Sequence, residues 1–158
     1  MPSRSGIVLL LILSISWISC CTGSRDGESF TSKIRYRQYY NNGKKLYLNN
    51  CSNCHQEDGT GLARLYPPLS ESDYFKADPG RTVCIIRHGQ QGEIDVNGIS
   101  FNQPMPANPG LTGLELAELM TYLYGTWGDE PTLFTIEDIS GLSGKCDQEH
   151  SRIHNSAD

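Results

Sequence analysis

The sequence has no cluster of basic residues. Its 13 Lys and Arg are outnumbered by 18 Asp and Glu, and the formal net charge at pH 7 is −5. Proteins bind nucleic acid largely by neutralising phosphates with Lys and Arg, so we expect no nucleic-acid partner. The chain of 158 residues is also too short for a large multidomain enzyme. The composition is that of one compact domain.

Long apolar runs are absent after residue 20. The run over residues 7–18 follows a single arginine and is too short for a confident transmembrane helix. A basic start, a short apolar core and small residues before a break are typical of a secretory signal. We therefore predict a signal segment over residues 1–20 and export from the cytoplasm. The serine before Cys20 resembles the lipobox of bacterial lipoproteins, which implies acylation of Cys20, with Cys21 or a plain secretory signal as alternatives.

Composition divides the rest of the chain into three parts. Residues 21–33 are rich in Ser, Gly and charged side chains, which predicts a flexible tether. Residues 147–158 are polar and without periodicity, which predicts a frayed C-terminal tail. The folded domain is therefore expected over residues 34–146. An apolar core of this size is only moderately stabilising, so a buried prosthetic group would add to the stability.

Three residues with ligand chemistry lie together at Cys51, Cys54 and His55. On a helix, positions three apart share a face, so both thiols can reach the vinyl groups of one porphyrin, and the histidine that follows can bind its iron. A structural zinc site and a redox-active thiol pair are the alternatives. Zinc would need a second Cys/His pair and the thiol pair a βαβ pattern, and the sequence has neither. The motif therefore favours covalent haem attachment.

The residues on both sides of the motif fit this interpretation. Apolar and aromatic residues over 39–48 predict an amphipathic helix that runs into Cys51, and Gly43 within it is small enough for another helix to cross closely. A haem-binding histidine needs its other ring nitrogen held, commonly by a backbone carbonyl. Pro67 is our candidate, because the fixed φ of proline holds its carbonyl in place. An ordinary stiffened loop is an equally good interpretation of the double proline at Pro67 and Pro68.

Taken together, these residues resemble the class I c-type cytochromes, in particular the small monohaem electron carriers of bacterial envelopes. The resemblance runs from Gly43 to about Pro131 and rests on the segments YLNNCSNCH, GTG, PPL, EIDVNGISFNQPMP and LTGLELAELMTYLYGTWGD. It implies an all-α class I cytochrome c fold, with several helices around one covalently bound haem c. It also implies that the first and last helices cross near Gly43, with Tyr122 or Tyr124 as the aromatic partner.

The resemblance also places a second axial ligand on a loop shortly before the last helix, where Met105 stands. Pro104 and Pro106 on either side stiffen this loop. A thioether ligand raises the reduction potential relative to a second histidine. An unligated surface methionine is the alternative.

Other side chains could compete for the iron. Met120 falls in a helical pattern of apolar residues and is expected in the core. His88, beside a glycine, is a weak rival that we expect to be solvated. His150 and His154 lie in the polar tail and receive no role.

Two local signals frame the Met105 loop. Alternating apolar residues over 94–101 surround Asn97-Gly98, a pair that suits a type I′ turn, and predict a small β-hairpin that delivers this loop. Thr112 and Glu115 have the spacing of a capping box. The last main helix is therefore expected to start at Thr112 and to run to about Gly125.

Two cysteines remain outside the haem motif, Cys84 and Cys146. Outside the cytoplasm a spare pair usually forms a disulfide, which would attach a short helix around residues 135–139 to the domain. Two free thiols are the alternative.

We interpret the chain as a single-electron carrier with His55 and Met105 as axial ligands, and not as an enzyme with a small-molecule substrate. A peroxidase-like haem enzyme or a gas-binding sensor would need a displaceable sixth ligand. The resemblance implies a membrane or periplasmic dehydrogenase as electron donor and an acceptor such as a terminal oxidase. The acidic chain favours a basic or largely apolar partner surface. The expected location is the bacterial periplasm or envelope, with a lipid anchor in the membrane.

Overall fold

The computed structural model describes residues 25–155. The expected signal segment, Cys20 and Cys21 lie outside this range, and the side chains of His150 and His154 are likewise not described. The chain divides into two units, Met1–Ile34 and Arg35–Asp158, and the packing described below is that within the second. No helix in the described range is long and apolar enough to cross a membrane.

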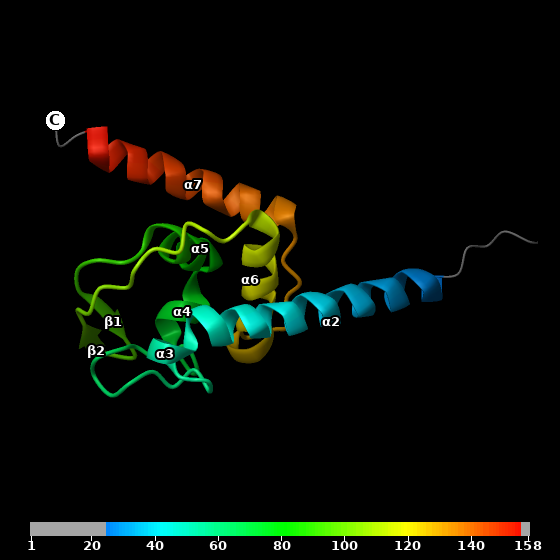
Figure 1. Cartoon of the computed structure of the whole chain (residues 1–158), viewed down its shortest axis with the longest axis horizontal. Helices are drawn as coiled ribbons and strands as arrows, with labels where there is room; N and C mark the ends of the chain where they lie inside the picture. Colours follow the sequence, from blue (N-terminus) through cyan, green and yellow to red (C-terminus); the bar gives the residue numbers. More distant parts are fainter. Residues whose placement is uncertain (1–24, 156–158) are drawn as a thin grey trace, which may run out of the picture. The chain divides into compact units, whose positions relative to one another are not determined.

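Helices dominate the described chain, and two short strands lie between them (Figure 1). The elements in order are α2 (Arg25–Asn50), α3 (Ser52–His55), α4 (Asp73–Ala77), α5 (Pro79–His88), β1 (Ile94–Val96), β2 (Ile99–Phe101), α6 (Gly113–Trp127) and α7 (Ile136–Asn155). This is the class I cytochrome fold class expected from the sequence, hairpin included.

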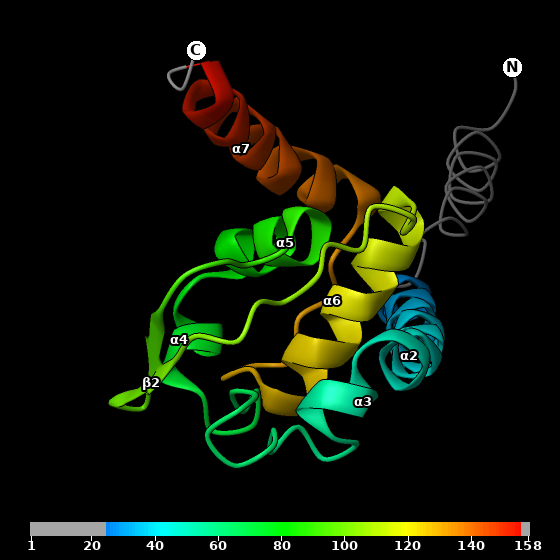
Figure 2. The same cartoon turned by 60° about the vertical axis from the view of Figure 1, so that its left-hand side comes forward.

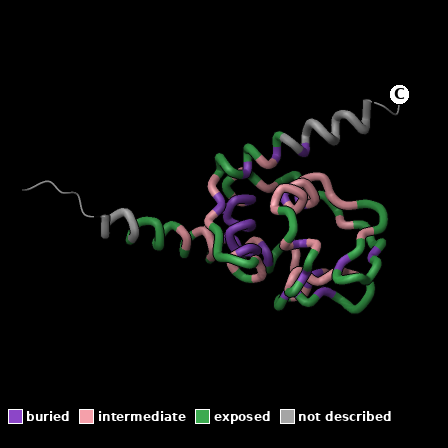
Figure 3. Tube along the Cα trace, turned by 180° about the vertical axis from the view of Figure 1, so that it is seen from behind, coloured by how far each residue is buried: buried purple, intermediate pink, exposed green. Residues whose placement is uncertain are grey.

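The core is built around α6, on which the buried residues gather in Figure 3. The helix starts where predicted: Thr112 accepts a hydrogen bond from the backbone of Glu115 and the Glu115 carboxylate accepts one in return, which closes the capping box. From Leu116 to Tyr124 every residue is buried. Such a helix, apolar nearly all round, needs neighbours on every side.

Helix α2 supplies one of these neighbours by crossing α6 at Gly43. A Cβ atom on Gly43 would lie 1.9 Å from the Glu118 carbonyl oxygen and 2.8 Å from the Cβ of Tyr122, so only glycine permits this approach. Asn42 donates a 2.8 Å hydrogen bond to the Glu118 carboxylate beside the crossing. The predicted close crossing is confirmed, and Tyr122 is the aromatic partner. Tyr124 points elsewhere and donates to the Phe75 carbonyl oxygen.

An aromatic cluster continues from this crossing toward the end of α6. The Tyr47 ring lies 5.4 Å from that of Tyr122 and 5.1 Å from that of Trp127, between ring centroids. Trp127 also covers Gly59, where an added Cβ would come within 2.6 Å of the indole. The cluster therefore joins α2, α6 and the chain that follows the haem motif.

The predicted hairpin is confirmed. Ile94 pairs with Phe101 and Val96 with Ile99, and the two turn residues, Asn97 and Gly98, have φ values of 52° and 72°, as a type I′ turn requires. The Asn97 backbone N–H donates to the Asp73 carboxylate, and the Asp73 backbone N–H donates to the Asn97 side-chain oxygen. The turn is thereby attached to the start of α4.

Helix α7 packs against α5 and α6 (Figure 2). Cys146 on α7 forms a disulfide with Cys84 on α5, with 5.4 Å between the Cα atoms. Helix α7 is longer than the short helix expected around residues 135–139. Its start is stabilised by a second capping pair, in which Thr135 and Asp138 exchange hydrogen bonds.

Both chain ends hold more helix than their composition indicated. Helix α2 begins at Arg25, so residues 25–33 of the expected tether are helical, and α7 continues to Asn155 through most of the expected polar tail. The reason is local: proline is absent from both segments, and Glu, Lys, Arg and Gln are good helix formers without an apolar face. Polarity alone does not separate a solvated helix from a loop.

Candidate haem site

One cavity of about 350 Å³ brings the predicted site residues together. Cys51, Cys54, His55, Pro67 and Met105 all line it. Most of the remaining wall is apolar and comes from the following side chains: Leu69, Phe75, Ile85, Ile86, Ile94, Val96, Phe101 and Leu123. These residues come from α3, α4, α5, both strands, α6 and the loops between them.

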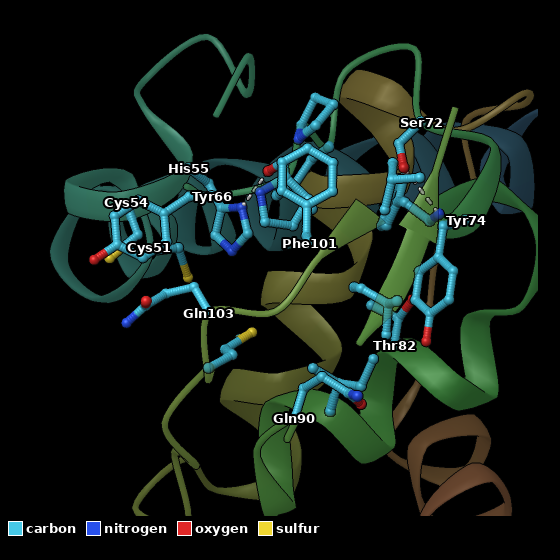
Figure 4. Close-up of a pocket in the computed structure, with 18 of the residues that line it drawn as sticks. Cys51, Cys54, His55, Tyr66, Ser72, Tyr74, Thr82, Gln90, Phe101 and Gln103 are labelled. Atoms are coloured by element: carbon cyan, nitrogen blue, oxygen red, sulfur yellow. Dashed lines mark hydrogen bonds between the residues drawn. The ribbon is translucent and has the colours of Figure 1, made fainter. Parts of the chain in front are cut away.

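The haem motif is held by a helical turn that continues from α2. The Cys51 N–H donates to the Tyr47 carbonyl at 2.9 Å and the His55 N–H donates to the Cys51 carbonyl at 3.0 Å. Figure 4 shows Cys51, Cys54 and His55 together at one end of the cavity. The helical spacing thus puts both thiols and the imidazole on the same wall, as the motif predicts.

The thiol of Cys51 is held protonated in this environment. Burial, and secondarily the neighbouring Cys54, raises the pKa of Cys51 to about 11. A protonated thiol is a poor nucleophile and a poor ligand for a metal ion. This environment does not suit a thiol that exchanges disulfides or binds zinc, so it weighs against both alternatives to haem attachment.

The imidazole of His55 is buried and oriented. Its Nδ1 lies 3.0 Å from the Pro67 carbonyl oxygen, and because a carbonyl can only accept, Nδ1 carries the proton. The lone pair of Nε2 is then free to bind a metal. Burial lowers the pKa of His55, against the smaller opposing effect of the Pro67 carbonyl, so the ring is neutral, as ligation requires.

A tight loop positions the Pro67 carbonyl. Gly61 has a φ of +69°, and an added Cβ would lie 2.3 Å from the Tyr66 carbonyl oxygen. The Gly59 carbonyl accepts hydrogen bonds from the backbone N–H groups of Leu69 and Ser70, at 2.7 and 3.0 Å. The two glycines therefore allow the chain to fold back on itself directly beneath the histidine.

The Met105 loop reaches the cavity from the side of α5. The backbone N–H and carbonyl of Met105 are both paired with those of Gln90, at 2.9 Å in each direction. In Figure 4, Gln90 and His55 lie on opposite sides of the cavity. His88 is not among the lining residues, and Met120 is fully buried in the core on α6.

The side chains that line the cavity fit a haem in their chemistry. Its polar side chains other than the motif include Ser72, Tyr74 and Thr82, which Figure 4 places at the end away from Cys51 and Cys54. A porphyrin needs an apolar wall for its ring and a polar end for its carboxylates. Among the residues whose side chains the structure describes, no group of three or more His, Cys, Asp or Glu could hold a metal ion, so the zinc interpretation has no support there.

Sequence reasoning missed the part of the site that holds the Met105 loop. Helix α5 carries a detectable start signal, since Asp78 accepts from the Arg81 N–H at the N-cap and Pro79 follows it. Gly89 ends the helix with a φ of 82°, which a glycine after a basic helix end indicates. Gln90 pairs with Met105 through its backbone groups, and no residue pattern reveals that pairing.

Comparison with known proteins also supports the assignment of this cavity as a haem site. The sequence model of the family described as "Cytochrome c" matches residues 40–127. Cytochrome c-552 of Thermus thermophilus is 30% identical over 112 residues, with 65% of this chain and 85% of that protein covered. The cytochrome c subunit of alcohol dehydrogenase (quinone) from Gluconobacter oxydans is 29% identical over 124 residues, with 76% of this chain but 25% of that protein covered.

The corresponding subunit from Komagataeibacter europaeus is 28% identical over 106 residues, with 63% of this chain and 22% of that protein covered. The family match spans more than half of the chain and contains the complete haem motif. The chain therefore belongs to the cytochrome c family as a class I c-type cytochrome, and its cofactor is one covalently bound haem c.

Proposed function

We propose that this cytochrome carries single electrons on a haem whose iron is ligated by Nε2 of His55 and Sδ of Met105. When bound, the haem supplies an iron that cycles between the ferrous and ferric states, at a potential that thioether ligation raises. The main observation in support of this proposal is that His55 and Met105 line the same cavity and each is held by hydrogen bonds to the backbone. Cys51 and Cys54 bind the ring covalently through their sulfur atoms.

The groups next to the two proposed ligands limit the movement of these ligands during electron transfer. The Pro67 carbonyl fixes the plane and the tautomer of the His55 ring. Pro104 and Pro106 restrict the backbone next to Met105. Ligands that keep their positions in both oxidation states allow fast transfer with little reorganisation.

The protein is an electron carrier and not itself an enzyme. A peroxidase would need acid-base groups above the iron, next to an open coordination position. The residues that line the cavity include neither Arg87 nor His88, the neighbouring arginine and histidine at the end of α5 that could have served as such groups. A gas sensor would need Met105 to leave the iron easily. Here the backbone N–H and carbonyl of Met105 are both hydrogen-bonded to Gln90, which restrains the loop.

The electron partners are proposed to be redox proteins. Two of the relatives are cytochrome c subunits of a quinone alcohol dehydrogenase, which supports a dehydrogenase as donor; a terminal oxidase is a suitable acceptor. A net charge of −5 favours a partner with a basic or largely apolar surface. We place the protein in the bacterial periplasm or envelope, lipid-anchored through Cys20.

Replacement of the proposed ligand tests the assignment. Met105→Ala should lower the midpoint potential, abolish the absorption band of methionine-ligated ferric iron, and let the reduced protein bind carbon monoxide. Met120→Leu, a nearly volume-conserving change of a fully buried methionine, is the matched control and should leave all three unchanged. An unchanged potential in Met105→Ala would mean that another residue ligates the iron.

Mass spectrometry of the mature protein tests the remaining assignments in one measurement. We expect the mass of one haem, acyl chains on an N-terminal Cys20, and the loss of two hydrogens for the Cys84–Cys146 bridge. A mature chain without acyl groups would disprove the lipid anchor and leave the electron carrier intact.

A further inference from the structure

The Met105 loop has few attachments of its own in the described structure. It has no regular secondary structure between β2 and α6, and its residues from 102 to 111 carry no charged side chain that could anchor it by an ion pair. What attaches it is the C-terminal end of α5. Gln90 pairs with both backbone groups of Met105, and the Asn108 N–H donates to the Ile86 carbonyl at 2.8 Å.

Gly89 makes this attachment possible in two ways. Its φ of 82° and ψ of 177° fall in a region that essentially only glycine occupies. An added Cβ would lie 2.7 Å from the Met105 carbonyl oxygen and 3.0 Å from the Ala107 nitrogen. Any side chain at this position would therefore displace the Met105 backbone from its present place against residue 89.

Helix α5 is itself a rigid support. The Gly89 N–H caps it by donating to the Ile85 carbonyl at 2.8 Å, and Cys84 attaches it covalently to α7. Ile85 and Ile86 line the cavity. Helix α5 forms part of the wall of the haem cavity, and it therefore also fixes the position of the Met105 backbone at this wall.

We propose that the segment Gly89-Gln90 is the positioning element that holds the Met105 thioether on the iron. The inference rests on the proposed ligation by Met105. It assigns ligand retention to a backbone pairing with α5, and not to the two prolines beside Met105. Gly89 and Gln90 are positioning residues and touch the iron in neither oxidation state.

The test compares two glycines with positive φ. Gly89→Ala introduces a Cβ against the Met105 backbone, whereas Gly98→Ala, at a φ of +72° in the hairpin turn, introduces one into open space. Both variants carry backbone strain, but only the first should move the ligand. We expect Gly89→Ala to lose the absorption band of methionine-ligated ferric iron. In the reduced state, its affinity for carbon monoxide should be at least about tenfold higher than that of the unchanged protein. Gly98→Ala should match the unchanged protein in both measurements.

Met105→Ala, measured alongside, distinguishes failure of the proposed ligation by Met105 from failure of the proposed positioning role of Gly89 and Gln90. If it keeps the absorption band, the proposed ligation is wrong. If it loses the band while Gly89→Ala keeps it, with unchanged carbon monoxide affinity, ligation stands and the positioning role is overturned.

Hydrogen exchange in the unmodified reduced holoprotein decides the matter should Gly89→Ala fail to fold. The amides of Gln90 and Met105 should exchange slowly and with the same opening free energy, because one pairing protects both. Fast exchange of either amide in the ligated protein would show that the pairing does not hold the loop.

Discussion

The hydrogen bond from His55 to Pro67 depends on a glycine six positions after the histidine. Gly61 lies against the Tyr66 and Pro67 backbone, and its N–H donates to the His55 carbonyl at 3.0 Å. The same residue therefore contacts the chain on both sides of the hydrogen bond. A local backbone conformation decides the orientation of a metal ligand here.

Gly61→Ala should destabilise the holoprotein by about 2 kcal/mol or more, because alanine is strained at a φ of +69° and its Cβ meets the Tyr66 carbonyl. Urea unfolding measures the loss. Gly110→Ala is the control: its Cβ would meet no atom within 4 Å, and a change within about 0.5 kcal/mol is expected. Equal effects of the two substitutions would rule out the packing role of Gly61.

At the residue scale, sequence reasoning predicted side chains better than backbone contacts. The haem motif requires particular side chains at fixed spacing, so Cys51, Cys54 and His55 could be grouped from the sequence. Their grouping in one cavity follows from a single helical turn. Gln90 could not be found, because its pairing with Met105 uses groups that every residue except proline possesses.

At the scale of the secondary-structure elements, α6 carries a titratable group in its N-terminal capping box. Hydrogen bonds from the backbone N–H and, secondarily, the side chain of Thr112 lower the pKa of Glu115 from its ordinary value of 4.5. A carboxylate with a depressed pKa stabilises the fold at pH values above its unfolded pKa, and this contribution is lost as the pH falls through the folded pKa. The capping box should therefore weaken below about pH 4.5.

Glu115→Gln tests this pH dependence, since glutamine keeps the shape of the side chain but does not titrate. We expect the variant to be less stable than the unchanged protein at neutral pH, and the difference to shrink as the pH falls below the ordinary glutamate pKa. Thermal unfolding at a series of pH values measures it. A difference that stays constant down to about pH 3 would contradict a role for the charge.

Elements with a strong local signal were predictable. The capping box predicted the start of α6, and Asn97-Gly98 predicted the hairpin, because both are set by residues within a few positions of each other. The length of α7 and the course of residues 25–33 were not predictable from composition, since a polar helix and a polar loop use the same residues. No local sequence pattern predicted the support that α5 gives to the Met105 loop.

At the scale of the whole molecule, the Cys84–Cys146 disulfide closes a loop of 62 residues that contains the hairpin, the Met105 loop and α6. Replacing both cysteines by alanine should lower the free energy of unfolding by up to about 4 kcal/mol, because the unfolded chain loses its constraint. Urea unfolding of the holoprotein measures the loss. Unchanged stability would mean that the bridge does not form in the native protein.

The indole of Trp127 lies one aromatic ring from the haem motif, because Tyr47, which it contacts, donates to the carbonyl of Gln56 directly after His55. The sequence contains two tryptophans, and the other, Trp17, lies in the segment expected to be removed. With the predicted removal of that segment, Trp127 becomes the one tryptophan of the mature chain, and it lies close to the haem motif, where a bound haem would quench its emission. The fluorescence of Trp127 should be quenched in the native holoprotein and should increase when the chain unfolds. Unfolding can therefore be followed without an added label.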